Sequence, residues 1–396
     1  MTFKNKVVQI NNPARQRILL RTAVFIITAF LTATCSPRLE PELPDYIVLP
    51  DGSKLIENQV FNRQVNLVGE EYSNLTIRNC VIEDLPKNHS GLYLRGVHDV
   101  LIENCTIRNL RGIRGGNGRG IRLSALEENT NITIRGCTIE TVESDGISIP
   151  QRSGGDSPVK NRGVRIINNT IRQVASGQRL LKRGLLHGIY CQGEDYVIEG
   201  NTVHTVGDGN GISVRTSGVI RGNTVYNVGA GDPIRYFNDH PWESSRPLLI
   251  ENNICYDESH ERGQRGMVRL SYDSLHPAYR GNAFIIRFNT LVSLHDQAYA
   301  ISVDEAYADA EVMIYGNLLV APNGQYIDGP ASLVNANYTT RVLDDFVSSR
   351  PPYNFHVTGD HNAVGYASQV SEWPVLDVDG EPREAGKLDA GADQHP

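Results

Sequence analysis

The insert GAGDPIRYFNDHPWESSRP, residues 229–247, gathers the side chains best suited to acid–base chemistry in this sequence. Asp239 and His240 are adjacent, and a carboxylate beside an imidazole can transfer a proton near neutral pH. Trp242 follows, and its ring could stack on a sugar ring. The other interpretation is a loop that folds on its own Trp242 and Tyr236. Both interpretations stay open at this point.

A second group of candidates lies in the stretch HGIYCQ, residues 187–192, and in the arginines that follow it. His187 or Tyr190 could take a proton from a substrate if neighbouring arginines lowered its pKa. Arg215 and Arg235 could pair a substrate carboxylate and stabilise the negative charge that develops as the proton leaves. The catalytic candidates are therefore Tyr190, His187, Arg215, Arg235, Asp239 and His240.

Basic inserts around these candidates favour an anionic ligand. The insert SGQRLLKRGLLH, residues 176–187, and the insert ESHERGQRG, residues 258–266, concentrate cations in a chain that is otherwise acidic. Guanidinium groups match the geometry of carboxylate and sulfate groups, so we expect a cleft for an anionic ligand. The alternative is a solvated surface on which Asp and Glu balance these arginines. The substrate-binding candidates are Arg122, Lys182, Arg183, Gln192, Trp242, Arg269 and Asp304.

The candidates stand on a phrase that returns nine times along the chain, for example as LTIRNCVIEDL, VLIENCTIRNL, VRIINNTIRQV and YVIEGNTVHTV. Its marker residue is cysteine in the first three copies and asparagine afterwards, and successive markers are 22 to 36 residues apart. A period in this range with inserts of variable length predicts a solenoid with one structural unit per turn. The markers are Cys80, Cys105, Cys137, Asn169, Asn201, Asn223, Asn253, Asn289 and Asn317.

A second phrase, typified by GISI and GISV, falls between the markers, and both phrases are short, β-branched and alternating. Two or three short strands per turn predict a parallel β-helix, with like positions stacked about 4.8 Å apart. Alternation then predicts two outward columns on one face. The first column is Tyr93, Arg122, Ser148, Tyr190, Ser213, Arg235, Arg269 and Ser302. The second is Arg95, Ser124, Gln192, Arg215, Ser271 and Asp304.

Stacking also explains why asparagine and cysteine share the marker position. An asparagine amide at a bend can bond the same amide one coil away and so satisfy buried polar groups as a ladder. Cys80, Cys105 and Cys137 should form a column of buried thiols, because no histidines accompany them at zinc-ligand spacing. Cys191 and Cys255 fall on apolar core positions.

The pairing of "I-x-x-N-x-[IV]" with "G-I-x-[VLI]" over residues 46–330 resembles right-handed parallel β-helix proteins of the pectate-lyase-like superfamily. The resemblance implies an all-β, single-stranded right-handed parallel β-helix. Residues 374–396, PVLDVDGEPREAGKLDAGADQHP, are similar to a C-terminal tail of exported bacterial β-helix proteins. We expect residues 331–396 to form an extended cap, because a bare terminal coil would be an open sheet edge.

The first 35 residues have the layout of a secretory signal: cations, then an apolar stretch, then small residues before Cys35. This end resembles a bacterial lipoprotein signal with lipidation at Cys35; ordinary cleavage and an uncleaved anchor are the alternatives. The net charge is −7, and removing the five cations of residues 1–34 takes it to −12, which excludes general attraction to nucleic acid. We expect an exported monomer, either periplasmic, on the cell surface as an outer-membrane lipoprotein, or secreted.

The resemblance implies action on an acidic, uronate-containing polysaccharide, most simply by β-elimination. A glycoside hydrolase or C5-epimerase of similar substrates and a non-catalytic binding or structural β-helix are the alternatives. Hydrolysis would need two carboxylates roughly 5–9 Å apart across the sugar. Asp145, Asp208, Asp239 and Asp304 could supply such a pair. No cofactor is assigned, and whether calcium neutralises the substrate carboxylate stays open.

Overall fold

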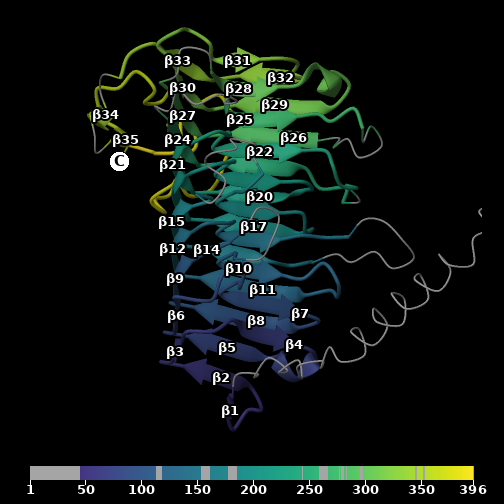
Figure 1. Cartoon of the computed structure of the whole chain (residues 1–396). Coiled ribbons are helices and arrows are strands. Elements are labelled where there is room, and N and C mark those ends of the chain that lie inside the picture. The colour runs from purple at the N-terminus through teal and green to yellow at the C-terminus, as the bar shows by residue number, and fades with distance from the viewer. Residues whose placement is uncertain are drawn as a thin grey trace, which may run out of the picture. The chain divides into compact units, whose positions relative to one another are not determined.

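Alternating apolar residues build three long sheets around one elongated core, as the computed structural model shows (Figure 1). Each coil gives one short strand to each sheet in turn, and each strand pairs in parallel with the equivalent strand of the next coil. In one coil, for example, β8 (His98–Glu103) is followed by β9 (Thr106–Leu110) and β10 (Ile121–Leu123), after which β11 (Thr130–Arg135) returns to pair with β8. The predicted parallel β-helix is confirmed.

The structure describes residues 45–112, 118–152, 161–176, 185–242, 244–257, 266–275, 277, 281, 283–294, 298–343, 346–350 and 353–395. The predicted signal segment with Cys35 lies outside these residues, and so do Lys182 and Arg183. In the described part of the chain, no helix is long and apolar enough to cross a membrane.

The 12-stranded sheet contains β1 (Ile47–Val48), β2 (Lys54–Glu57), β5 (Leu75–Arg78), β8, β11, β14 (Arg165–Ile167), β17 (Tyr196–Glu199), β20 (Gly218–Arg221), β23 (Leu248–Glu251), β26 (Ala283–Arg287), β29 (Glu311–Tyr315) and β32 (Leu333–Asn335). The 11-stranded sheet contains β3 (Val60–Phe61), β6 (Val81–Glu83), β9, β12 (Thr138–Val142), β15 (Thr170–Val174), β18 (Thr202–Val206), β21 (Thr224–Val228), β24 (Ile254–Asp257), β27 (Thr290–Ser293), β30 (Leu318–Val320) and β33 (Tyr338–Thr340).

The 10-stranded sheet contains β4 (Val65–Val68), β7 (Leu92–Arg95), β10, β13 (Ile147–Ile149), β16 (Ile189–Cys191), β19 (Ile212–Val214), β22 (Ile234–Phe237), β25 (Gly266–Ser271), β28 (Tyr299–Val303) and β31 (Ile327–Asp328). Two short 3₁₀ helices, η1 (Glu70–Tyr72) and η3 (Glu305–Tyr307), lie between coils. A two-stranded hairpin, β34 (Phe346–Ser348) and β35 (Asn354–Val357), follows the last coil.

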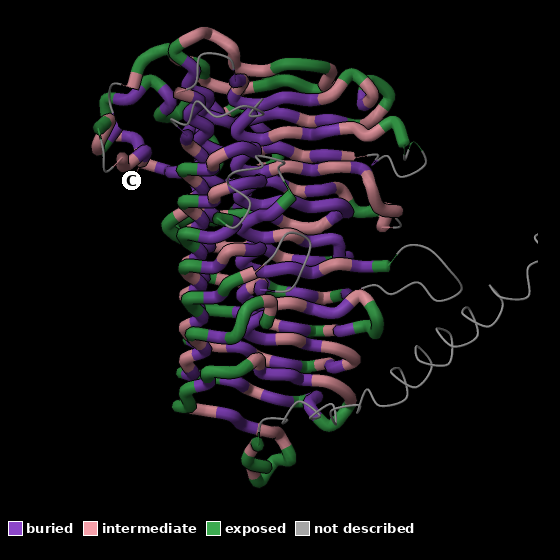
Figure 2. The backbone as a smooth tube through the Cα atoms, in the orientation of Figure 1, coloured by how far each residue is buried: buried purple, intermediate pink, exposed green. Residues whose placement is uncertain are grey.

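The interior is filled by columns of aliphatic side chains that repeat from coil to coil. Figure 2 shows the buried residues recurring along the successive coils. Ile102, Ile134, Ile166 and Ile198 are successive members of one such column, and each is fully buried. Alternate residues of the same strands face outward, which is the alternation that the sequence predicts.

Every strand of the 12-stranded sheet from β2 onward is joined to the next strand of the 11-stranded sheet by a bend of two residues. The first residue of the bend has a positive φ, for example 52° at Asn104 and 62° at Gly136, a conformation that asparagine and glycine tolerate best. The second is the marker residue. The bend therefore explains both the Asn or Gly that precedes every marker except Asn289, where Phe288 adopts the same conformation with a φ of 51°, and the constant length of the phrase.

The predicted asparagine ladder is confirmed. The Oδ1 of Asn223 accepts both the backbone N–H and the Nδ2 hydrogen of Asn201, each at 2.9 Å, and the pattern repeats from coil to coil. The ladder ends at Asn337, one rung beyond the markers found in the sequence. At the other end, Cys105 donates its backbone N–H to the sulfur of Cys137 at 3.4 Å. The five cysteines of the described residues are buried and free.

The glycine of the second phrase is needed for space. A Cβ atom at Gly146 would lie 2.6 Å from the carbonyl oxygen of Gly188 and 2.6 Å from Cγ2 of Ile171. Equivalent glycines of neighbouring coils stack in the same way, so the backbone of one coil occupies the place of the missing side chain. This close approach sets the path of the chain into the 10-stranded sheet.

The C-terminal residues pack against the side of the last coils. β32 and β33 pair in parallel with β29 and β30, so the coils continue to Thr340, past the end that the sequence predicted at residue 330. The tail then covers outward apolar side chains of β24, β27 and β30, including Ile254, Val292 and Leu318. The tail lies on the side of the last coils because these outward positions are apolar.

Candidate functional site

The outward face of the 10-stranded sheet brings most of the predicted site residues together. Tyr190 pairs with Ser213 of the next coil, Ser213 pairs with Arg235, and Arg235 pairs with Arg269. The first predicted outward column is therefore confirmed in its register. Beside it, the Arg215 guanidinium lies over the Tyr190 ring, 4.8 Å from its centroid.

Asp239 and His240 reach this face from the segment after β22. Oδ1 of Asp239 lies 2.7 Å from Nδ1 of His240 and 2.8 Å from Nε of Arg215. Burial alone would raise the pKa of Asp239, but the hydrogen bond with His240 and the charge of Arg215 outweigh it and lower that pKa. The charged carboxylate fixes the His240 proton on Nδ1. The lone pair of Nε2 is thereby left available, and no described residue hydrogen-bonds to this atom.

Tyr190 is held as a neutral phenol. Burial is the largest influence and raises the pKa of Tyr190 to about 12, although Arg215 acts to lower it. The Gln192 amide orients the hydroxyl: its Oε1 accepts the backbone N–H of Gln151 at 2.9 Å, and its Nε2 donates to the Tyr190 oxygen. The phenol proton therefore remains free for donation to a third group. This arrangement suits Tyr190 as an acid rather than as a base.

Gln192 lies between the two titratable groups. Its Nε2 donates to the Tyr190 hydroxyl and lies 3.2 Å from Nδ1 of His240. Both nitrogens carry hydrogen when the His240 proton is on Nδ1, so this second contact is not a hydrogen bond, but it places His240 and Tyr190 within a few ångströms of each other on the same face.

His187 is placed next to Tyr190, with the two rings stacked at 5.2 Å, but its hydrogen bonds do not suit a base. Nδ1 lies 3.0 Å from the backbone N of Asn210, which can only donate, so the neutral ring carries its proton on Nε2. Burial first, and then the charges of Arg215 and Arg235, hold the pKa of His187 well below its usual value. The side chain is only 3% exposed.

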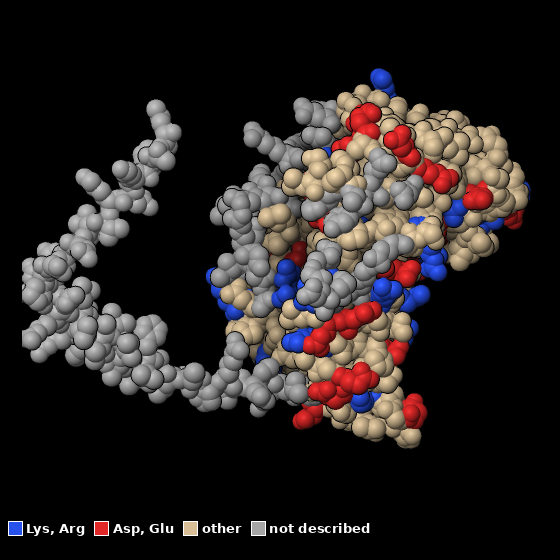
Figure 3. Space-filling model, turned by 90° about the vertical axis from the view of Figure 1, so that its right-hand side faces the viewer, with Lys and Arg blue, Asp and Glu red and all other residues tan. Residues whose placement is uncertain are grey.

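The arginines of this face are balanced in part by buried acids. Arg119 pairs with Asp145 at 2.8 Å, and burial raises the pKa of that carboxyl. Oδ2 of Asp232 lies 3.8 Å from Nε of Arg235 and 3.7 Å from Nη1 of Arg269. The surface shown in Figure 3 likewise has basic and acidic side chains interspersed. Near Tyr190, the described part of the face places the guanidinium groups of Arg119, Arg122, Arg215, Arg235 and Arg269 beside the carboxylates of Asp145, Asp232 and Asp239.

Two substrate-binding candidates have structural contacts instead. Trp242 packs edge-on against Tyr236 and Phe284, with ring centroids 5.6 and 5.4 Å away, as in the interpretation of a loop folded on its own aromatic residues. Asp304 caps η3 by accepting the backbone N–H of Ala306 at 3.1 Å. Asp208 accepts the backbone N–H groups of Leu185 and Leu186. The Trp242 ring is thus engaged by the loop's own aromatic packing, and the two carboxylates hold backbone N–H groups.

One residue of the site was missed in the sequence. Phe237 lies between two arginines, with its ring centroid 5.4 Å from the Arg215 guanidinium and 5.3 Å from that of Arg235. Its position two residues after Arg235 places it in the second outward column, beside Ser271. The alternation that identified the other members could therefore have identified Phe237.

The comparisons with known proteins agree with this architecture. A family model described as "Right handed beta helix region" matches residues 45–185. No curated protein sequence matches the chain. The described strands pair in parallel from coil to coil well beyond the matched residues, so the fold is that of a right-handed parallel β-helix.

Solved structures with a similar fold include two enzymes and a tailspike protein. The A-module of the Azotobacter vinelandii mannuronan C-5 epimerase AlgE6 is 13% identical, with a TM-score of 0.42, over 72% of this chain and 79% of that one. The catalytic unit of a GH87 alpha-1,3-glucanase from Streptomyces thermodiastaticus is 13% identical, with a TM-score of 0.34, over 72% and 58%. The Dettilon tailspike protein is 13% identical, with a TM-score of 0.35, over 70% and 62%. Identities and TM-scores this low carry no argument about activity.

Proposed function

We propose that this protein is a polysaccharide lyase that cleaves a uronate-containing polymer by β-elimination on the outward face of the 10-stranded sheet. The observation that carries the proposal is the Asp239–His240 pair, which leaves Nε2 of His240 as a base, and its closeness to the protonated hydroxyl of Tyr190, with Gln192 lying between the two side chains. A base and an acid of different kinds, side by side, are what an elimination requires.

In the proposed reaction, Nε2 of His240 takes the proton from C5 of the uronate. The electron pair of the C5–H bond forms the C4–C5 double bond as the C4–O bond breaks. Tyr190 gives its phenol proton to the departing glycosidic oxygen. Arg235 and Arg269 neutralise the uronate carboxylate, which makes the C5 proton more acidic, and fixed charges of this kind are usually a large catalytic contribution.

The carboxylates of the face argue against hydrolysis as the reaction. A hydrolase needs a protonated carboxyl to donate and a second carboxylate across the sugar. Asp239 is ionised, with its pKa lowered, and Asp145 is 3% exposed and bound to Arg119 and to the backbone of His187. Neither side chain is suited to the role of the acid.

The test is an assay of the purified protein on alginate, pectate, chondroitin and heparin-like polymers, read by the ultraviolet absorbance of the conjugated enoate product. His240→Ala and Tyr190→Phe should each reduce turnover by roughly 10²–10⁴. His204→Ala and Tyr226→Phe are matched controls, because this stacked pair lies on the 11-stranded sheet, and they should leave turnover unchanged.

Two other results would redirect the proposal. Inversion at C5 without an absorbing product, seen by nuclear magnetic resonance, would make the same base and acid those of an epimerase. Binding of a polymer with neither reaction would favour the non-catalytic alternative. Turnover that survives both His240→Ala and Tyr190→Phe would show that the base and acid are wrongly assigned.

A polymer substrate outside the cell requires export, so we also propose that residues 1–35 direct secretion and that Cys35 carries a lipid. Cys35→Ser should abolish incorporation of a radiolabelled fatty acid and release the protein from the membrane fraction. A membrane-bound, unlabelled wild type would instead indicate an uncleaved anchor.

A further inference from the structure

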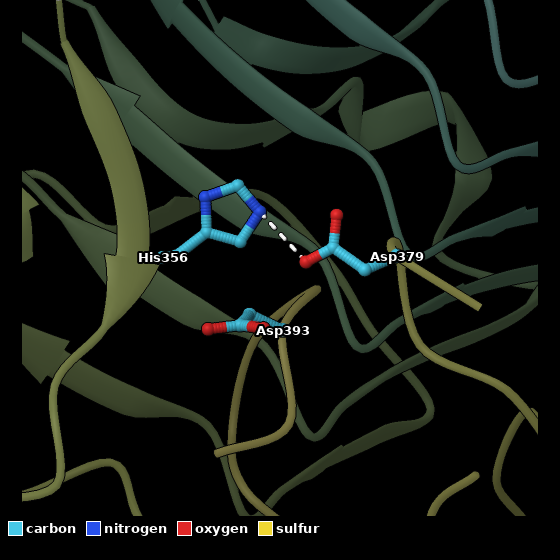
Figure 4. A group of neighbouring side chains, drawn as sticks. All are labelled: His356, Asp379 and Asp393. Atoms are coloured by element: carbon cyan, nitrogen blue, oxygen red, sulfur yellow. Dashed lines mark ion pairs between the residues drawn. The ribbon is translucent and has the colours of Figure 1, made fainter. Parts of the chain in front are cut away.

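Three side chains able to ligate a metal converge in the C-terminal tail, away from the 10-stranded face (Figure 4). His356 lies on β35, Asp379 lies in the turn after Val378, and Asp393 lies near the C-terminus. One ligand atom from each residue lies within 4.8 Å of the other two. Nε2 of His356 and Oδ2 of Asp379 are 3.0 Å apart, close to the separation of two atoms bound to one small cation.

The hydrogen bonds of His356 direct Nε2 toward this group. Its Nδ1 contacts Oδ1 of Asn354, an acceptor, so the neutral ring carries its proton on Nδ1 and offers the Nε2 lone pair to Asp379. A lone pair facing a carboxylate is unfavourable unless a proton or a cation lies between them. A second hydrogen bond that fixes the tautomer is also the usual setting of a metal-bound histidine.

Asp393 gives the independent indication that a cation belongs there. It is only 7% exposed, and its Oδ2 accepts the backbone N–H of Val357 at 2.8 Å. The other oxygen, Oδ1, has no hydrogen-bond partner among the described residues. A carboxylate that is this deeply buried is costly unless its charge is compensated.

The charged residues around the group make their hydrogen bonds with other partners. Asp377 uses Oδ1 to accept the backbone N–H groups of Asp379 and Glu381, and Oδ2 to accept that of Gln394. Nη2 of Arg383 is bound to the carbonyl oxygens of Gly391 and Ala392. Two carboxylates therefore face one imidazole.

We propose that His356, Asp379 and Asp393 bind a first-row divalent metal ion and that the ion ties together three segments of the tail. One imidazole with two carboxylates suits Zn²⁺ better than Ca²⁺, which prefers oxygen ligands only. Three protein ligands leave the fourth tetrahedral position to water. The proposal is independent of the proposed lyase activity.

The test is titration of Zn²⁺ into the chelator-treated full-length protein by calorimetry, with thermal unfolding measured alongside. The wild type should bind one Zn²⁺ and unfold at a higher temperature with it. Asp379→Asn should weaken binding by at least about tenfold and abolish the thermal shift. Asp360→Asn, which removes an exposed carboxylate of the same tail, is the matched control and should behave like the wild type.

An X-ray absorption spectrum of the Zn²⁺ complex supplies a second readout, which should show one imidazole nitrogen with oxygen ligands. Absence of Zn²⁺ binding by the wild type would overturn the proposal and leave an ordinary His356–Asp379 ion pair. If Asp379→Asn bound Zn²⁺ as tightly as the wild type, Asp379 would not be a ligand. If the wild type bound Ca²⁺ tightly and did not bind Zn²⁺, the assignment to a first-row divalent metal ion would be wrong.

Discussion

The neutral imidazole of His187 should make the fold sensitive to mild acid. Burial keeps the folded-state pKa of His187 well below the usual 6.5, whereas the unfolded chain binds a proton near that value. Above about pH 6.5, His187 is neutral in both states and does not lower the free energy of unfolding. As the pH falls from there toward the folded-state pKa, the unfolded chain binds a proton that the folded chain does not, and the free energy of unfolding falls by about 1.4 kcal/mol per pH unit. The measurement is the free energy of unfolding in urea at pH 7, 6 and 5.

The matched variants for this measurement are His187→Gln, which removes the titrating group, and His89→Gln, which changes an exposed histidine. His187→Gln should unfold with a shallower dependence on pH than the wild type, and His89→Gln should keep the wild-type slope. The same slope in all three proteins would mean that other groups cause the acid sensitivity.

Arg269 should contribute to ligand binding, since Asp232, at 3.7 Å, is shared with Arg235. Arg269→Ala should weaken binding of an anionic polysaccharide by roughly fivefold at low salt, and the difference should shrink as salt screens the charges. Arg78→Ala, on β5 of the 12-stranded sheet, is the control and should have no effect. Equal losses in both variants, measured by titration calorimetry, would mean diffuse attraction and no groove.

Sequence alternation identified which side chains face outward, but it could not identify their partners. Tyr190, Arg215 and Arg235 follow from strand periodicity alone. The pairing of Arg215 with Asp239 depends on the path of an irregular segment, which no periodicity specifies. The tautomer of His187 depends on a backbone N–H from the next coil, at Asn210, so the expected base became a buried donor.

At the scale of the strand and its bend, each asparagine of the ladder should contribute more to the free energy of unfolding than each cysteine of the column. Asn223→Leu leaves the backbone N–H and amide of Asn201 buried without their acceptor, at about 1–3 kcal/mol for each unsatisfied group. Cys105→Ala should cost less, because thiol contacts are weak hydrogen bonds. Asn335→Leu, at an exposed position of β32, is the control and should be nearly neutral.

The melting temperatures of these variants, measured with and without reductant, test how much the ladder stabilises the fold. Reductant should leave every melting temperature unchanged, since the described cysteines are free. A loss for Asn335→Leu as large as that for Asn223→Leu would argue against a special role of the ladder.

The repeated elements were predictable because each coil has the same local sequence pattern: a residue with positive φ, an asparagine or cysteine marker, and alternating apolar residues. Asn337 was missed because its strand, Tyr338–Thr340, lacks the apolar run that identified the other markers. The tail could not be predicted in the same way, since its hairpin and turns are irregular. One signal was present nonetheless, because outward residues of β24, β27 and β30 are apolar where earlier coils have polar ones.

For the molecule as a whole, Arg383 should hold the tail on the coils. It is 6% exposed, its Nη2 reaches Asn252 Oδ1 at 3.2 Å, and its guanidinium lies 4.8 Å from the Phe288 ring centroid. Burial lowers the pKa of Arg383 to about 10, so it remains charged at neutral pH. Arg383→Leu should cost about 3 kcal/mol, because buried carbonyl groups lose a charged donor.

Limited proteolysis and thermal unfolding measure that loss. Arg383→Leu should be cut in the tail much faster than the wild type, whereas Lys387→Leu, which removes an exposed cation of the same tail, should resist as the wild type does. Unchanged proteolysis of Arg383→Leu would show that the apolar contacts alone retain the tail.

In each coil, the two-residue bend at the marker has a constant length, whereas the other two corners vary in length. Because that corner never changes length, the register of every coil is reset there, and chain inserted at the other two corners does not displace the coils that follow. Those corners flank the 10-stranded face and hold the inserts of residues 111–120, 175–188 and 238–247. Loops at those two corners can thus be exchanged, lengthened or grafted one coil at a time, which makes this scaffold modular for engineering and for evolution alike.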